Sequence, residues 1–275
     1  MSAPLLLDHR AVISVSGADA ETFLQGLVTV STIDVAENET RYGALLTPQG
    51  KVIADMLLTR TADGFLLDCD ASVSPSLLKR LRLFKLRAAV AIEERSDLGV
   101  IAFDGSPDPR AAGAPHRRIA PRAAALTGDP ATYHTERIAN GIPEQGIDFG
   151  AEDVFPADIN MDLLGGIDFR KGCFVGQEVV SRMKRRGITR RRTLKAIVRV
   201  GTPAPSPILA AGFEIGTLTS ISGVTALARV RTDRVAEANA KGEPITVADK
   251  PILLDQPKWL AQELAAMAEA KEAKA

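Results

Sequence analysis

The residues best suited to chemistry lie in one short stretch, residues 170–182 (RKGCFVGQEVVSR), which is centred on Cys173. A cysteine loses its proton more readily beside cations and near the start of a helix, and the thiolate is the reactive form. Arg170 and Lys171 precede Cys173, and we expect a helix to begin just after it. The stretch therefore predicts a reactive thiol with a lowered pKa. The alternative is a small buried apolar residue, which is the commoner fate of a free cysteine.

The neighbours of Cys173 favour the first interpretation. Gly172 and Gly176 leave the backbone on either side without side chains, so a ligand or a partner can approach it closely. Glu178 and Arg182 are four residues apart, the spacing of an ion pair along one face of a helix. These residues predict a site open to another molecule.

The cysteine count restricts the metal chemistry. Cys69 and Cys173 are the two cysteines of the sequence, and two thiols cannot supply four thiolates to an iron–sulfur cluster. His9, His116 and His134 are too widely separated to show metal-ligand spacing. We therefore expect no metal to be bound by the monomer alone, while a cluster shared across an interface stays open. Cys69 lies in an apolar stretch, and we expect it to be structural.

A second feature is a basic cluster of seven cations within eleven residues: Arg182, Lys184, Arg185, Arg186, Arg190, Arg191 and Arg192. It has three interpretations. It can be a solvated turn between domains, an anion site for ligand carboxylates or an acidic partner, or a contact to RNA phosphates. One Trp and two Tyr leave few rings for stacking on bases, so direct nucleic-acid binding is not expected.

Composition describes an ordinary globular protein. The chain has 275 residues, 45% hydrophobic and 25% charged, which suits one large domain or two unequal ones. Its 34 basic and 34 acidic residues balance, which excludes a general polyanion binder. No secretory signature and no membrane-spanning apolar run are present, so we expect a cytoplasmic protein without membrane contact.

The elements that must position these residues indicate an α+β fold. A turn at residues 48–50 (PQG) joins two strands, because proline sets the first corner and glycine tolerates positive φ. The apolar spacing predicts strands at 11–15, 42–47, 52–59, 65–69, 89–92 and 100–103, with 117–121 as a further short one. It predicts helices from Ser16 through Leu27, at 74–84 and at 132–140.

The pattern changes after residue 192. Short apolar runs at 194–200, 213–220, 224–230 and 245–247, separated by glycines, predict a small antiparallel barrel or sandwich. From Lys258 the sequence is rich in Ala, Glu and Lys, which indicates a terminal helix or a frayed tail. We therefore expect an α+β domain at 1–192, a β-barrel at 193–257 and a tail at 258–275.

Residues 171–178 (KGCFVGQE) resemble the K-G-C-[YF]-x-G-Q-E signature of the YgfZ family. That family belongs to the superfamily of the glycine-cleavage T protein, the aminomethyltransferase. Residues 23–26 (FLQG), 46–51 (LTPQGK) and 137–143 (RIANGIP) resemble its first helix, its hairpin and its R-I-x-x-G-I-P segment. The resemblance spans residues 12–250.

The resemblance implies a folate-binding body with ferredoxin-like sheet-and-helix units and a central hole, followed by a small antiparallel barrel. It implies binding of tetrahydrofolate or a one-carbon derivative, and support for the assembly or repair of iron–sulfur enzymes, including tRNA-modifying ones. The implied partners are those enzymes or cluster-assembly proteins. Its motif residues here are Cys173 with Lys171, Gly172, Gly176, Gln177, Glu178 and Arg182.

Two departures from the T protein bear on the alternative function of an aminomethyltransferase. Its hairpin resembles G-x-V-x-D-D, whereas residues 50–55 (GKVIAD) keep only Asp55. Its R-x-E-x-G glutamate meets the pterin, whereas Ala139 occupies that position here and cannot accept a side-chain hydrogen bond. Both argue against glycine-cleavage chemistry. Asp55 and Arg137 remain candidate folate contacts, although Asp55 can also be a solvated carboxylate at a strand end.

Overall fold

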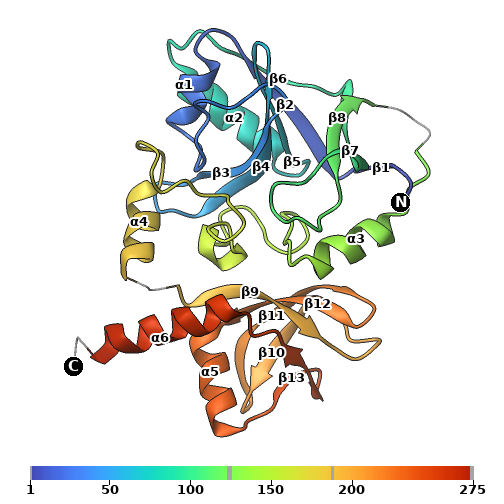
Figure 1. Cartoon of the computed structure of the whole chain (residues 1–275), viewed down its shortest axis with the longest axis vertical. Coiled ribbons are helices and arrows are strands. Elements are labelled where there is room, and N and C mark those ends of the chain that lie inside the picture. The colour runs from blue at the N-terminus through green and yellow to red at the C-terminus, as the bar shows by residue number, and fades with distance from the viewer. Residues whose placement is uncertain (1, 123–125, 187–188, 273–275) are drawn as a thin grey trace.

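The protein consists of an α+β body above a β-barrel (Figure 1). The computed structural model describes residues 2–122, 126–186 and 189–272. The main sheet of the body is antiparallel, with the strand order β3-β4-β5-β2-β6. Its strands are β2 (Arg10–Ser16), β3 (Thr40–Leu46), β4 (Val52–Thr61), β5 (Gly64–Asp70) and β6 (Ala91–Glu94).

The two faces of this sheet differ in chemistry because successive side chains of a strand point to opposite sides. One face carries the apolar side chains of Ile13, Met56 and Leu67. Helices α1 (Ala20–Gln25) and α2 (Ser74–Lys85) pack on it and complete an apolar core. The opposite face carries charged residues, and the rest of the body covers it.

That cover contains a second sheet and several short elements. The sheet has the order β1-β7-β8 and is formed by β1 (Leu5–Leu6), β7 (Leu98–Ser106) and β8 (Arg117–Pro121). Helix α3 (Pro130–Ala139), the 3-10 turn η1 (Pro156–Ile159) and helix α4 (Gln177–Arg186) follow. Helix α4 lies at the edge of the body on the side of β3 (Figure 1).

The barrel has its own apolar core and the strand order β14-β13-β10-β11-β12-β9-β15. Its strands are β9 (Arg191–Ile197), β10 (Ser206–Ala210), β11 (Phe213–Ser222), β12 (Thr225–Arg231), β13 (Ile245–Val247), β14 (Lys250–Pro251) and β15 (Leu253–Leu254). Helices α5 (Thr232–Lys241) and α6 (Lys258–Glu272) pack against it. The predicted α+β body followed by a small antiparallel barrel is confirmed.

Some predicted elements differ from the structure. Helix α1 begins at Ala20 and not at Ser16, because β2 continues through Ser16 and the chain turns at Gly17, whose φ is 121°. Helix α5 and strand β10 were not predicted. Among the described helices, none combines the length and the apolar character needed to cross a membrane.

Candidate functional site

The loop that carries Cys173 is anchored to the segment that follows α1. Lys171 is buried, and its ammonium donates hydrogen bonds to the carbonyl oxygens of Gln25, Val28 and Val30 at 2.7, 2.6 and 3.0 Å. Burial lowers the pKa of Lys171 to about 8. Lys171, the cation expected beside the thiol, therefore binds these carbonyl oxygens instead. Its ammonium holds the loop in place.

The residues after Cys173 fix the loop to the edge strand of the main sheet. Phe174 is buried in an apolar cluster with Tyr42 of β3 and Leu57 of β4, on the charged side of the sheet. Val175, the next residue, packs against the core on the helical side. Adjacent side chains therefore insert on opposite faces of the sheet and fix the position of the loop at its edge.

Two glycines bring the hairpin between β3 and β4 against the start of α4. Gly176 has a φ of 81°, and a Cβ there would lie 2.6 Å from the carbonyl oxygen of Thr47. Gly50 has a φ of 80°, and a Cβ there would lie 3.1 Å from the Cβ of Val179. Only glycine combines this conformation with so close an approach. Three of the four segments that resembled one family at separate places in the sequence, residues 23–26, 46–51 and 171–178, thus meet around one loop.

Cys173 is exposed at this junction. A Cβ on its neighbour Gly172 would meet nothing within 4 Å, so packing within the chain does not require glycine there. Helix α4 begins at Gln177, four residues after the cysteine and later than predicted. Glu178 and Arg182 are both exposed, and the ion pairs of the described residues do not include one between them. Cys69 is fully buried, as predicted, and burial raises its pKa to about 12.

The second candidate site is a buried charged network on the other face of the sheet. Asp55 is 2% exposed, so it is not a solvated strand-end carboxylate. Tyr42 donates a hydrogen bond to its Oδ2 at 2.9 Å, while its Oδ1 has no hydrogen-bond partner. Gln145 accepts from the backbone N–H of Asp55 and donates to the carbonyl oxygen of Ile53, where β4 is not paired with β5. Burial raises the pKa of Asp55 above its ordinary value, although nearby arginines oppose the shift.

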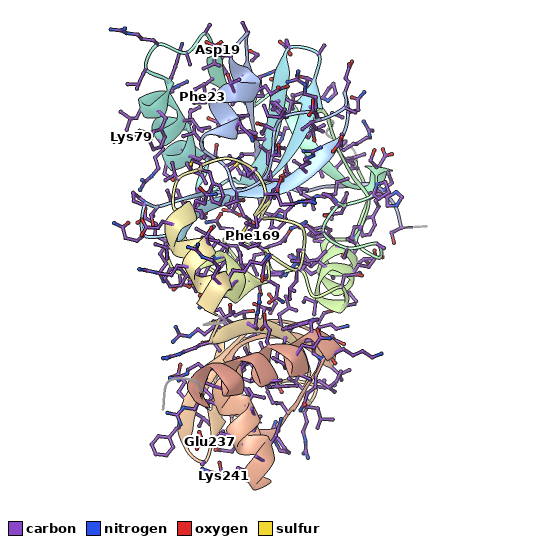
Figure 2. All side chains as sticks on the ribbon, turned by 60° about the vertical axis from the view of Figure 1, so that its left-hand side comes forward. Asp19, Phe23, Lys79, Phe169, Glu237 and Lys241 are labelled. Atoms are coloured by element: carbon purple, nitrogen blue, oxygen red, sulfur yellow. The ribbon has the colours of Figure 1, made fainter. Side chains whose placement is uncertain are left out.

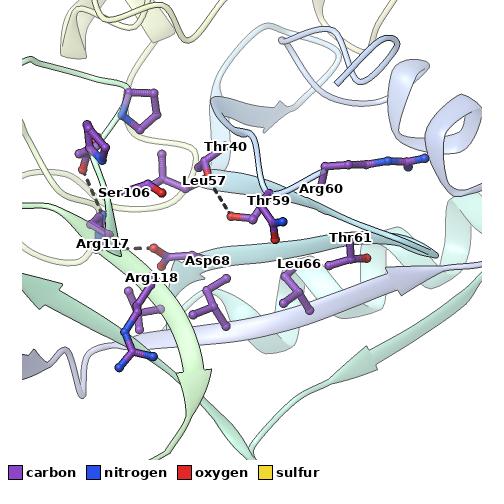
Figure 3. Close-up of a pocket in the computed structure, with 16 residues that line it drawn as sticks. Thr40, Leu57, Thr59, Arg60, Thr61, Leu66, Asp68, Ser106, Arg117 and Arg118 are labelled. Atoms are coloured by element: carbon purple, nitrogen blue, oxygen red, sulfur yellow. Dashed lines mark hydrogen bonds and ion pairs between the residues drawn. The ribbon is translucent and has the colours of Figure 1, made fainter. Parts of the chain in front are cut away.

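Arg117 is the cation of this network that has no hydrogen bond. Asp68 pairs with Arg10 at 2.6 Å, and Asp108 pairs with Arg110 at 2.7 Å. The Arg117 guanidinium lies 3.6 Å from each of these carboxylates, and none of its nitrogens is hydrogen-bonded. It lines a cavity of about 190 Å³ between the main sheet and β8, where it points toward Asp68 (Figure 3).

Arg137, a predicted folate contact, lies buried between the body and the barrel. It is 2% exposed, and its guanidinium donates to Asp148 at 2.7 Å, to Ser220 of β11 at 2.8 Å and to His134 at 3.0 Å. Asp148 in turn accepts from Thr219 and Ser220 of the barrel. Every nitrogen of this guanidinium donates at least one hydrogen bond, and the bond to Ser220 joins the body to the barrel.

Glu144 completes the network and was not identified from the sequence. It is fully buried, accepts a short hydrogen bond from the Tyr133 hydroxyl and lies 3.5 Å from His9 Nε2. Although burial opposes it, His9 and the surrounding arginines hold the pKa of Glu144 well below its ordinary value. The available signal for the network was the presence of carboxylates in otherwise apolar strands, Asp55 in β4 and Asp68 in β5, which is unusual for strands covered on both faces.

The basic cluster is divided by the structure. Arg192 is buried and pairs with Asp162 at 2.6 Å and with Glu263 of α6, so it does not belong to an exposed patch. Burial alone would lower the pKa of Arg192, but the hydrogen bonds that it donates to both carboxylates raise it. Arg182, Lys184, Arg185, Arg190 and Arg191 are exposed.

Comparison with known proteins defines the class first. Residues 7–111 match the GCVT N-terminal domain family, and residues 190–262 match the family of the CAF17 C-terminal β-barrel domain. The aminomethyltransferase T of Bartonella henselae superposes with a TM-score of 0.70 over 94% of this chain and 86% of its own, at 16% identity. The chain is therefore a T-protein-like fold with a CAF17-type barrel, as its fold was predicted to be.

Sequence relatives define the family. The mouse protein named iron-sulfur cluster assembly factor IBA57, mitochondrial, is 30% identical over 83% of this chain and 77% of its own length. The Mycosarcoma maydis homologue of the same name is 34% identical over 73% of this chain, which spans 58% of that relative's length. This chain belongs to the IBA57 family.

Two predictions are corrected by these relatives. The YgfZ resemblance led to the right superfamily, but the named relatives are IBA57 proteins. The cytoplasmic prediction is contradicted, because these relatives are named mitochondrial. That prediction rested on reduced thiols and on the lack of secretory or membrane signals, which do not distinguish one reducing compartment from another.

Proposed function

We propose that this chain is an accessory factor in the assembly or repair of iron–sulfur proteins and that Cys173 is its working thiol. The supporting observation is an exposed thiol on a loop that Lys171, Phe174 and Gly176 hold rigidly at the sheet edge. The names of its relatives are consistent with this role.

The chemistry that suits this thiol is ligation of a cluster together with a partner. Within the described residues, no group of three or more His, Cys, Asp or Glu side chains is placed to hold a metal ion. A single thiolate supplies one ligand of the four that a cluster needs. The remaining ligands would come from a client enzyme or an assembly protein, and the cluster is cargo in this proposal.

Complementation tests the role of the thiol. Cys173→Ser should fold normally, yet fail to restore iron–sulfur enzyme activity in cells that lack this protein. The assay should include a tRNA-modifying iron–sulfur enzyme, since the resemblance implies such clients. Lys79→Glu is the control, because it changes an exposed residue of α2 and leaves the loop of Cys173 unchanged. Full restoration by a folded Cys173→Ser protein would contradict the proposal.

We propose in addition that the Asp55 network binds tetrahydrofolate or a one-carbon derivative. The chemistry of the residues fits this group. The unpartnered Oδ1 of Asp55 can accept hydrogen bonds from the N–H groups of a pterin. The unpaired nitrogens of Arg117 suit the carboxylates of the folate tail. Bound folate would supply a one-carbon unit, with Asp55 holding the pterin end and Arg117 the tail.

This second proposal requires the body to open. The cavity beside Arg117 holds about 190 Å³, whereas pockets for ligands of this size hold roughly 300–1,000 Å³. Calorimetry should show tetrahydrofolate binding to the native protein, with a loss of at least tenfold for Arg117→Gln. Lys79→Glu, an exposed change on α2, is the control. The absence of heat and of a thermal shift at millimolar folate would contradict folate binding and leave the role of the thiol untouched.

The alternative function, folate-dependent aminomethyl transfer, has weaker support. Asp55 would have to orient the reacting atoms alone, because Ala54 stands where the T protein has its other carboxylate. Ala139 is exposed at the end of α3, with its carbonyl oxygen 3.4 Å from Lys195 of the barrel. Turnover with an aminomethyl donor would distinguish a transferase from an accessory factor.

A further inference from the structure

One surface formed by the loop of Cys173 and the helix that follows it carries positive charge without paired carboxylates. It consists of Arg170, in the loop before the cysteine, and Arg182, Lys184 and Arg185 of α4, and we call it the α4 cationic surface. All four side chains are exposed, and none has a carboxylate within ion-pair distance among the described residues. Glu178 is the exposed carboxylate of α4.

This surface gathers several unpaired cations in one part of the body. Elsewhere, some exposed arginines pair with a nearby carboxylate, as in Arg118–Asp104 at 2.6 Å and Arg234–Glu237 at 2.8 Å, while others, such as Arg87 and Arg199, have no carboxylate within ion-pair distance among the described residues. The chain has no net charge, so any positive potential on it must arise from a local cluster of cations. Four neighbouring cations without such a partner create a local positive potential, which attracts an acidic surface.

The geometry ties this surface to the thiol. Helix α4 follows the loop of Cys173 directly, and Gly176 and Val179 hold its first turn against the hairpin. Lys184 lies over the ring of Phe169, 3.5 Å from its centroid. Phe169 belongs to the segment that leads into the loop of Cys173 (Figure 2). The cation therefore covers the aromatic face that a nucleic-acid base would need for stacking.

We infer that the α4 cationic surface is the docking site for an acidic face of the protein that exchanges a cluster with Cys173. The inference rests on the proposed function and adds the chemistry of the partner. Arginine forks pair with carboxylates bidentately, and an approach along α4 brings the partner to the exposed thiol and to the open backbone at Gly172. Charge complementarity of this kind mainly accelerates association and selects the partner.

The first test uses a poly-glutamate peptide as the probe. Binding is measured by fluorescence anisotropy, together with the rate at which iodoacetamide alkylates Cys173. The peptide should slow the alkylation, and Arg182→Glu with Arg185→Glu should weaken its binding at least tenfold. The matched control is Lys79→Glu with Lys250→Glu, which changes the net charge equally at two exposed lysines on α2 and β14. Equal loss in both double variants, or tighter binding of an RNA oligonucleotide of equal charge, would overturn the inference.

The second test separates this inference from the proposed function. The Arg182→Glu, Arg185→Glu protein should be as stable as wild type and should restore less than a tenth of the iron–sulfur enzyme activity in cells that lack the chain. If it restores full activity while Cys173→Ser does not, the docking surface is wrong and the role of the thiol stands. If Cys173→Ser also restores activity, the proposed function itself fails.

Discussion

Replacement of Lys171 by methionine tests whether its ammonium holds the Cys173 loop. Methionine has a similar length and removes the charge together with three hydrogen bonds of 2.6–3.0 Å. A buried carbonyl left without a partner costs about 1–3 kcal/mol. Lys171 is 9% exposed, so water can reach part of the site. We therefore expect the free energy of unfolding to fall by about 3 kcal/mol, near the lower end of the sum over three carbonyls.

Two variants serve as comparisons in urea unfolding. Lys171→Arg keeps the charge, but a planar guanidinium cannot direct donors at three carbonyls around one point, so it should recover less than half of the loss. Lys184→Met removes an exposed ammonium from above Phe169 and should cost about 1 kcal/mol or less. Hydrogen exchange should become faster in residues 168–176 of the Lys171→Met protein, while the strands of the main sheet keep their protection.

The stability of Lys171→Met relative to the other two variants decides whether the three hydrogen bonds hold the loop. If Lys171→Met and Lys184→Met lose the same small amount of stability and residues 168–176 exchange as in wild type, the three hydrogen bonds do not hold the loop. If Lys171→Arg is as stable as wild type, charge alone is sufficient and the geometry of the three carbonyls is irrelevant.

Three further predictions use the same measurement. Asp55→Asn should stabilise the protein at neutral pH. Burial raises the folded-state pKa of Asp55. The contribution of this carboxyl group to stability is therefore present below the unfolded pKa and is lost as the pH rises through the folded value. Urea unfolding between pH 4 and 8 should show that the free energy of unfolding of the variant, relative to wild type, increases with pH. Gly176→Ala should cost about 2 kcal/mol, because its φ is 81° and its Cβ would meet a carbonyl oxygen, while Gly172→Ala should cost less than about 0.5 kcal/mol. Cys69→Ser should lower the free energy of unfolding by about 1–3 kcal/mol, because it buries a hydroxyl, and Cys173→Ser should lower it by about 1 kcal/mol or less. The reverse order would show that Cys173 is the structural cysteine and Cys69 is not.

Local chemistry made much of the fold predictable. The turn at residues 48–50 depends on its own proline and glycine, and Gly50 does adopt positive φ. Gly141, with a φ of 70°, ends α3 as predicted. Helix α5 was missed because its buried apolar positions are chiefly Val235 and Ala238, and alanine gives little contrast between the faces of a helix.

The partners of the site residues were not predictable in the same way. Lys171 and the carbonyl of Gln25 are 146 residues apart, and the bond between them depends on the docking of two segments. Proximity in sequence suggested that the charge of Lys171 lowers the pKa of the Cys173 thiol. In the structure its buried ammonium donates instead to carbonyl oxygens of the segment that follows α1. Arg137 shows the same limit, because its partner Ser220 belongs to a barrel strand 83 residues away.

The exposed thiol and the buried carboxylate are linked through one strand. Tyr42 of β3 donates its hydroxyl hydrogen bond to Asp55, and its ring belongs to the apolar cluster that contains Phe174. Phe174 directly follows Cys173. Packing and hydrogen bonding therefore connect the two sites without a break. A Tyr42→Phe change removes the hydroxyl and keeps the ring in the cluster. It therefore perturbs the carboxylate without displacing the loop, and it distinguishes an effect of the buried network on the thiol from simple loss of packing.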